Sequence, residues 1–313
     1  MEILEVIQPG LYTTVQDRGR FGYLQFGIPL SGVMDVYAYQ VSNLLVGNEI
    51  NAAVLEATVI GPVLNILEDG VMAITGADLS AHLNDSPFPL WESVAVKKGD
   101  KVSFKMPKKG CRAYIAVGGG IDVPLVMGSR STYVVGKIGG IEGRPLVAKD
   151  LIGKGKNFGI PGRRVPPEFI PVYSNSPTLR VLLGPQDNYF SEGVQIFLDS
   201  EFKISTKADR IGYRLEGPVI PHKEGVEKSI ISEPGIPGGV QVPADGQPII
   251  FLLEQTVGGY TKIASVISTD IGLVGQAKTG DRVRFKSVGL GEAYRLVAEE
   301  RERIEKLINL LAR

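Results

Sequence analysis

Short apolar runs separated by glycine, proline, asparagine and aspartate make up most of the chain. Such runs are typical of β-strands joined by turns. The pattern predicts strands over Ile3–Ile7, Leu11–Val15, Val54–Ile60, Val71–Thr75, Ser93–Val96, Lys101–Lys105, Ala113–Val117, Leu179–Leu183, Phe202–Ser205, Ile249–Leu253 and Ile263–Ser268.

Two segments have helical spacing instead. The first is Val36–Val46, which Asp35 can N-cap and which Gly47 can end in the left-handed conformation. The second is Glu292–Ala312, where apolar residues recur at helical intervals between Glu and Arg. Apolar stripes usually face a core, so we favour packing of this C-terminal helix on the protein over partner binding.

A weak internal repeat is present. Gly99-Asp100-Lys101-Val102-Ser103-Phe104-Lys105 returns as Gly280-Asp281-Arg282-Val283-Arg284-Phe285-Lys286. We expect an aromatic strand after each copy, at Arg112-Ala113-Tyr114 and at Ala293-Tyr294-Arg295. Leu55-Glu56 with Gly61-Pro62 similarly matches Leu215-Glu216-Gly217-Pro218. Two matches in the same order indicate two related β-barrels. The Pro- and Arg-rich segment 161–167 is the predicted linker, giving domains 1–160 and 168–313.

Composition narrows the functional classes. The 313 residues carry 34 Lys and Arg against 34 Asp and Glu, which disfavours nucleic-acid binding. One cysteine and two histidines disfavour a disulfide framework and a metal site. The sequence shows no signal peptide and no apolar run near the roughly 18 residues of a membrane span. We therefore expect a cytoplasmic protein without membrane segments.

Standard catalytic motifs are absent, including the phosphate loop, the dinucleotide fingerprint and the nucleophile elbow. Three clusters of polar residues among glycines remain as candidate sites. They are Gln16–Arg20 with Gly27–Asp35, then Gly128–Tyr133, and finally Gly238–Lys262. The first cluster can also be explained as an ion-paired turn with a helix cap, and the third as a hairpin with polar faces.

The third cluster combines amide and cationic side chains. Gln241 and Gln255 can each donate to and accept from an amide-like substrate. Lys262 can place a positive charge near a developing oxyanion. In the second cluster, hydroxyls beside a guanidinium suit a carboxylate or phosphate.

Taken together and in order, motifs along nearly the whole chain resemble one family, that of the C-type subunit of 5-oxoprolinase and of allophanate hydrolase subunit 2. This family is similar to biotin-dependent carboxyltransferases. The motifs include Gly10-Leu11-Tyr12-Thr13-Thr14-Val15-Gln16-Asp17, Ser31-Gly32-Val33-Met34-Asp35, Gly119-Gly120-Ile121-Asp122-Val123-Pro124, Gly128-Ser129-Arg130-Ser131-Thr132-Tyr133, Gly212-Tyr213-Arg214-Leu215-Glu216-Gly217-Pro218 and Gln255-Thr256-Val257-Gly258-Gly259-Tyr260.

The resemblance implies a mainly β chain with two cyclophilin-like β-barrel domains, short helices and the long C-terminal helix. It implies ATP-dependent opening of 5-oxo-L-proline to L-glutamate, in a hetero-complex with a B-type and an A-type partner subunit. Phosphorylation of the lactam oxygen would make the unreactive ring carbon open to attack. The ATP site would be shared with a partner. The chain departs from the family pattern at Leu253-Glu254 and at Thr261.

On this basis we expect a catalytic set of Asp17, Gln241, Gln255 and Lys262. Contacts to substrate or phosphate are expected from Arg18, Ser31, Asp35, Arg130, Ser131, Thr132, Thr256, Gly259 and Tyr260. No metal ligand is assigned.

Two other functions remain open at this point. Similar sequences form the carboxyltransferase half of urea carboxylase, which acts on urea- and allophanate-type amides. This chain carries no biotin attachment motif, so biotin would have to come from another protein. Other relatives are regulatory antagonists of a kinase inhibitor.

Overall fold

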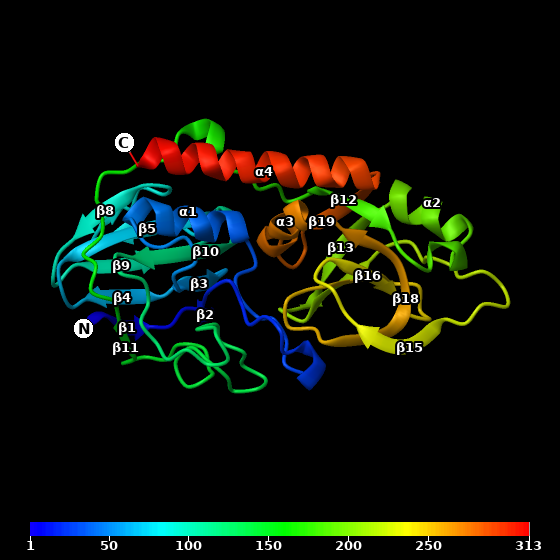
Figure 1. Cartoon of the computed structure of the whole chain (residues 1–313), viewed down its shortest axis with the longest axis horizontal. Helices are drawn as coiled ribbons and strands as arrows, with labels where there is room; N and C mark the ends of the chain where they lie inside the picture. The colour runs from blue at the N-terminus through cyan, green and yellow to red at the C-terminus, as the bar shows by residue number, and fades with distance from the viewer. Residues whose placement is uncertain (313) are drawn as a thin grey trace. The chain divides into compact units, whose positions relative to one another are not determined.

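The computed structural model describes residues 1–312, and it divides into two units (Figure 1). Unit 1 contains Met1–Phe21, Ser31–Tyr173 and the chain from Arg303 onward. Unit 2 contains Gly22–Leu30 and Ser174–Glu302. The segment 161–167, expected as a linker, lies within unit 1, where the buried Val165 donates its backbone N–H to the Trp91 carbonyl.

Two antiparallel sheets form the body of unit 1. One has the order β11-β1-β4-β9-β6-β7, and the other has the order β2-β3-β10-β5-β8. The first sheet contains β1 (Glu2–Gln8), β4 (Val63–Ile66), β6 (Ala81–Leu83), β7 (Ser86–Pro87), β9 (Lys101–Phe104) and β11 (Leu151–Gly153). The second contains β2 (Tyr12–Gln16), β3 (Val54–Thr58), β5 (Gly70–Asp78), β8 (Ser93–Val96) and β10 (Lys109–Val117).

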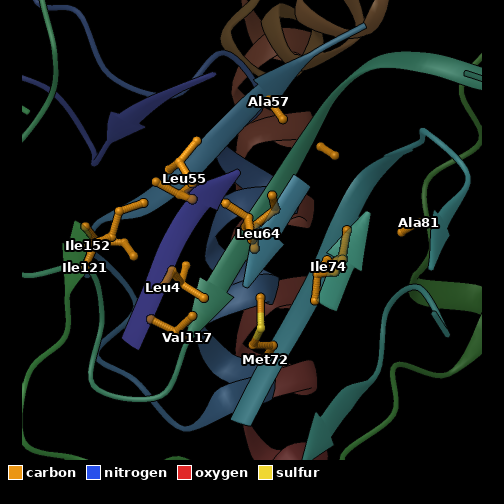
Figure 2. Packing of buried hydrophobic residues seen from close by; sticks show 14 of the residues in the cluster. Leu4, Leu55, Ala57, Leu64, Met72, Ile74, Ala81, Val117, Ile121 and Ile152 are labelled. Atoms are coloured by element: carbon orange, nitrogen blue, oxygen red, sulfur yellow. The ribbon is translucent and has the colours of Figure 1, made fainter. Parts of the chain in front are cut away.

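Strand β10 is buried on both faces, which explains its nearly continuous apolar sequence. Ala113, Ile115 and Val117 belong to the core shared by the two sheets, part of which Figure 2 shows around Leu4, Leu64 and Met72. Successive side chains of a strand point to opposite faces. The intervening residues, such as Tyr114, therefore join a second core against helix α1 (Val36–Val46).

The ends of helix α1 match the sequence prediction, which is confirmed. The Asp35 carboxylate accepts a hydrogen bond of 3.0 Å from the Ala38 backbone N–H. Gly47 ends the helix in the left-handed region with φ +76°. The same Asp35 carboxylate also accepts a hydrogen bond of 2.7 Å from the Tyr173 hydroxyl.

Unit 2 is built on one sheet that closes on itself. Its order is β12-β19-β13-β14-β17-β16-β18, and a further pairing of β12 with β18 completes the ring. Strand β15 pairs with the first residues of β18, from Val257 to Tyr260. The strands are β12 (Thr178–Leu183), β13 (Glu201–Ala208), β14 (Gly212–Glu216), β15 (Ser229–Pro234), β16 (Gly239–Val242), β17 (Ile249–Phe251), β18 (Val257–Val266) and β19 (Arg282–Ser287).

Three further α-helices complete the regular structure of the described residues, apart from four short 3₁₀ segments. They are α2 (Glu192–Asp199), α3 (Ile271–Gln276) and α4 (Leu290–Leu311). The predictions of a mainly β chain and of a long C-terminal helix are therefore confirmed. No helix within residues 1–312 is both long and apolar enough to cross a membrane.

The two copies of the sequence repeat form the same turn. Gly99 and Gly280 have φ +90° and +91°, and the carboxylates of Asp100 and Asp281 accept from the backbone N–H three residues earlier. Each turn leads into a strand, β9 or β19. The expected strand at Ala293–Arg295 is wrong, because these residues lie in helix α4, whose amphipathic spacing continues through them.

We expect Asp35→Ala to lower the free energy of unfolding by about 2 kcal/mol, because it removes a helix cap and leaves the Tyr173 hydroxyl without its acceptor. Asp35→Asn is the matched control and should lose less than about 1 kcal/mol, since asparagine caps helices equally well. Urea denaturation followed by circular dichroism measures both. Equal stability of the alanine variant and the parent would contradict this role.

Candidate functional site

A pocket of about 490 Å³ lies in unit 2, over strands β14, β16, β17 and the start of β18. We call it the Gln241 pocket. Its wall combines charged, amide and apolar side chains with three glycines: Lys207, Asp209, Ile211, Gly212, Arg214, Gln241, Ile249, Phe251, Gln255, Val257, Gly258, Gly259 and Tyr260. Four residues predicted from the third sequence cluster are therefore brought together here, namely Gln241, Gln255, Gly259 and Tyr260.

The Gln241 side chain is fully buried, yet neither its Nε2 nor its Oε1 has a hydrogen-bond partner among the described residues. Buried amides are nearly always hydrogen-bonded, and an unsatisfied group costs about 1–3 kcal/mol. Gly258 packs closely over this amide, because a Cβ added there would lie 2.3 Å from Nε2. The glycine therefore leaves room for an amide that has both a donor and an acceptor unused.

Two cations stand on the pocket wall. Lys207 and Arg214 are exposed, and within residues 1–312 neither side chain has an ion pair or a hydrogen bond. Asp209 is the acidic residue of the wall. Its Oδ1 accepts hydrogen bonds from the backbone N–H groups of Ile211 and Gly212 at 2.8 and 3.1 Å and so stabilises the local turn. The pocket can therefore attract an anionic group.

The remaining residues of the third cluster lie beside the pocket. Lys262 is the register partner of Gln241 across β16 and β18, but its ammonium pairs with Glu233. Thr256 does not line the pocket, and its carbonyl accepts from the Gly235 N–H. The amide of Gln255 donates to the Val257 carbonyl and so spans the turn that leads into β18. The structure thus places Lys262 and Thr256 near the pocket rather than on its wall.

The first and second sequence clusters meet in unit 1, around the Asp17 carboxylate. Oδ1 accepts from Gly19 N–H at 2.9 Å and from the hydroxyls of Ser129 and Ser131 at 2.6 Å each. Oδ2 accepts from the Arg130 backbone N–H at 2.6 Å. Four hydrogen bonds fill the capacity of this carboxylate. In the described structure this carboxylate organises the loop, and its catalytic role stays a prediction.

Arg130 and Thr132, which were also predicted as site residues, make hydrogen bonds within unit 1. The Arg130 guanidinium donates to the Val123 carbonyl and pairs with Asp122. Thr132 donates its hydroxyl to the Val15 carbonyl. Arg18 is exposed, and the charges of Asp17 and Arg18 act on the Tyr39 phenol, whose pKa is raised chiefly by burial.

Ser31 is the predicted site residue of this region whose buried side chain makes no hydrogen bond within residues 1–312. Its hydroxyl is fully buried and has no partner among the described residues, and its backbone has φ +53°. Gly32 follows with φ +88° and packs against the backbone of Arg18 and Gly19. The sequence prediction of a ligand contact at Ser31 stays a prediction.

Residues 1–312 contain no group of three or more His, Cys, Asp or Glu side chains arranged to hold a metal ion. Cys111 is buried in strand β10. Both histidines are half-buried, and His222 contacts the Thr261 hydroxyl at 2.8 Å.

Sequence reasoning missed Lys207, Asp209 and Arg214 of the pocket wall. A signal was available for Arg214, because it belongs to the motif Gly212–Pro218 that carries the family resemblance. A second signal was Glu254, one of the residues at which the chain departs from the family pattern. Glu254 forms a buried ion pair of 2.5 Å with Arg210. This pair links the segments that contribute Asp209, Ile211 and Gln255 to the pocket.

Comparison with known proteins agrees with this architecture. The family model described as "Carboxyltransferase domain, subdomain A and B" matches residues 26–287. The chain belongs to the carboxyltransferase domain family. Within that family it is 38% identical to the C-type subunit of 5-oxoprolinase from Escherichia coli, with 97% of each chain covered. It is 33% identical to urea amidolyase of Lachancea kluyveri, of which it spans 18%.

A solved member of the family shows the same fold. The crystal structure of urea amidolyase from Kluyveromyces lactis superposes with a TM-score of 0.92 at 30% identity. The match covers 98% of this chain and 20% of that one. The same carboxyltransferase fold therefore occurs both as a subunit-sized chain and as part of a much longer enzyme.

We expect Gln241→Met to raise the free energy of unfolding by about 1 kcal/mol, because it replaces an unsatisfied buried amide by an apolar group of similar shape. Gln16→Met is the matched control. Gln16 is equally buried, but its amide makes hydrogen bonds to Thr14, Thr132 and Gly32, so its loss should cost about 2 kcal/mol or more. Chemical denaturation compares the two. If both variants lose stability equally, the Gln241 amide has a structural partner such as an internal water.

Proposed function

We propose that this carboxyltransferase-family chain is one component of an ATP-dependent 5-oxoprolinase, which opens 5-oxo-L-proline to L-glutamate. The observation that carries the proposal is the end-to-end match with the C-type subunit of 5-oxoprolinase, which covers 97% of both chains. The corresponding 5-oxoprolinase subunit of Haemophilus influenzae matches in the same way, with 94% of each chain covered. The urea amidolyases match only over a small part of their length.

The Gln241 pocket supports this function chemically. A lactam offers one N–H donor and one carbonyl acceptor, and Gln241 has one unused group of each kind. We assign the lactam to Gln241 and Gln255, which both line the pocket. Lys262 is the register partner of Gln241 and pairs with Glu233. When substrate binds, its ammonium would leave Glu233 and stabilise negative charge on the lactam oxygen.

ATP would supply the driving force for opening the unreactive lactam ring. The sequence contains no Gly-x-x-x-x-Gly-Lys-Ser/Thr loop, and the cations of the Gln241 pocket suit a single anionic group. We therefore propose that ATP binds at a site shared with a B-type partner, in a complex that also holds an A-type partner. Because ATP is an intracellular substrate, we assign the complex to the cytoplasm.

A carboxyltransferase acting on urea-type amides is the second candidate, because the fold matches urea amidolyase at a TM-score of 0.92. The two functions differ in substrate charge, since urea is neutral and 5-oxoproline carries a carboxylate. Unpaired Lys207 and Arg214 on the pocket wall favour the anionic substrate.

We expect the chain, purified together with its B-type and A-type partners, to hydrolyse ATP in response to 5-oxo-L-proline and to release glutamate. A coupled ADP assay and glutamate detection by chromatography measure the two products. Turnover of urea instead of 5-oxo-L-proline, with a biotin-carrying partner present, would favour the second candidate.

Within that complex, Lys262→Ala should lower 5-oxoproline-dependent ATP hydrolysis by about 100- to 1000-fold, as loss of one charge-stabilising donor typically does. His82→Ala is the control, because His82 lies in unit 1 and its ring contacts the Ser80 carbonyl. It should leave the rate nearly unchanged. Full activity of Lys262→Ala would show that Lys262 only pairs with Glu233.

A further inference from the structure

We propose that Arg214, assisted by Lys207, binds the carboxylate of the substrate and makes the Gln241 pocket specific for anionic cyclic amides. This inference rests on the proposed function, and it adds the residue that selects the substrate. It follows from three features of unit 2: the register of its strands, the unpaired cations and the geometry of a cyclic amide.

Register places Arg214 and Gln241 in one row across the sheet. Arg214 on β14 and Gln241 on β16 are both backbone partners of Ile249 on the intervening strand β17. Directly opposed residues project from the same face of a sheet. All three residues accordingly line the pocket. With neighbouring strands about 5 Å apart, the backbones of Arg214 and Gln241 are separated by about 10 Å.

The Gln241 end of this row selects a cis amide. Peptide-like amides are almost always trans, which puts N–H and C=O on opposite edges. A small ring forces the amide to be cis, so that N–H and C=O lie on the same edge. The side-chain amide of Gln241 presents its own carbonyl and N–H in the same side-by-side way. It can therefore form two hydrogen bonds with a lactam, but only one with a trans amide.

The Arg214 end of the row selects negative charge. A guanidinium binds a carboxylate through two parallel hydrogen bonds, which are stronger than neutral ones. Asp209 does not compete strongly, because its Oδ1 is held by the Ile211 and Gly212 backbone. Ile249 between the two ends, and Phe251 two residues further along β17, supply apolar surface for the ring methylenes. A lactam that carries a carboxylate satisfies every part of this row, whereas urea leaves Arg214 without a partner.

The test measures kcat and KM for 5-oxo-L-proline in the complete complex. Arg214→Gln should raise KM by about 10- to 100-fold, the factor expected for a lost charged hydrogen bond, and should change kcat by less than about threefold. Arg214→Lys keeps the charge without the fork and should give an intermediate KM. Lys207→Gln should raise KM by a smaller factor. Arg301→Gln, at another exposed arginine of unit 2, is the matched control and should change neither constant.

An unchanged KM in Arg214→Gln would overturn the inference and leave the proposed function intact. Equal loss of kcat in the Gln and Lys variants, with lowered stability to urea, would also overturn it, because Arg214 would then support the fold. If the unmodified complex does not turn over 5-oxo-L-proline, the proposed function itself fails. If Arg214→Gln does not fold, the KM values of Arg214→Lys and Lys207→Gln decide in the same way.

Discussion

Closure of the sheet in unit 2 depends on strand β18, and the Gln241 pocket depends on that closure. The ten residues of β18 pair with β16 along one edge, and with β15 and then β12 along the other. The first part of the strand contributes Gly258, Gly259 and Tyr260 to the pocket wall. The later part holds the ring closed. One strand therefore fixes both the barrel and the position of the wall opposite Gln241.

Gln16 and Gln241 show the difference between a satisfied buried amide and an unsatisfied one. Both are fully buried, but three hydrogen bonds occupy Gln16, whereas Gln241 makes none within the described structure. The Asp17 carboxylate resembles Gln16, because backbone and hydroxyl donors fill it. A fold stable by only about 5–15 kcal/mol keeps few unsatisfied groups without a function. The unsatisfied Gln241 amide is therefore the group of unit 2 to which we propose that the substrate binds.

The sequence predicted the local features of this fold well. Helix α1 and its caps at Asp35 and Gly47 follow from signals within a dozen residues, as do the paired Gly-Asp turns at Gly99 and Gly280. Prediction failed at Ala293–Arg295, where a short similarity to a strand competed with the periodicity of a whole helix. The sequence could not show that the Asp17 carboxylate is already hydrogen-bonded within the protein. Its donors Ser129 and Ser131 come from a segment that is distant in the sequence.

The pocket wall was harder to predict because it depends on strand register. Arg214 and Gln241 become neighbours only through Ile249, a residue distant from Arg214 in sequence and opposite to both in the sheet. A slip of one residue would turn every side chain of a strand to the other face, and Gln241 would exchange places with the core residues Val240 and Val242. The pairing of β16 with β18 is irregular between Val240 and Gln241, and it places Lys262 opposite Gln241. The chemistry of the pocket is thus a consequence of how three strands are aligned, and neither residue type nor spacing within one motif contains that information.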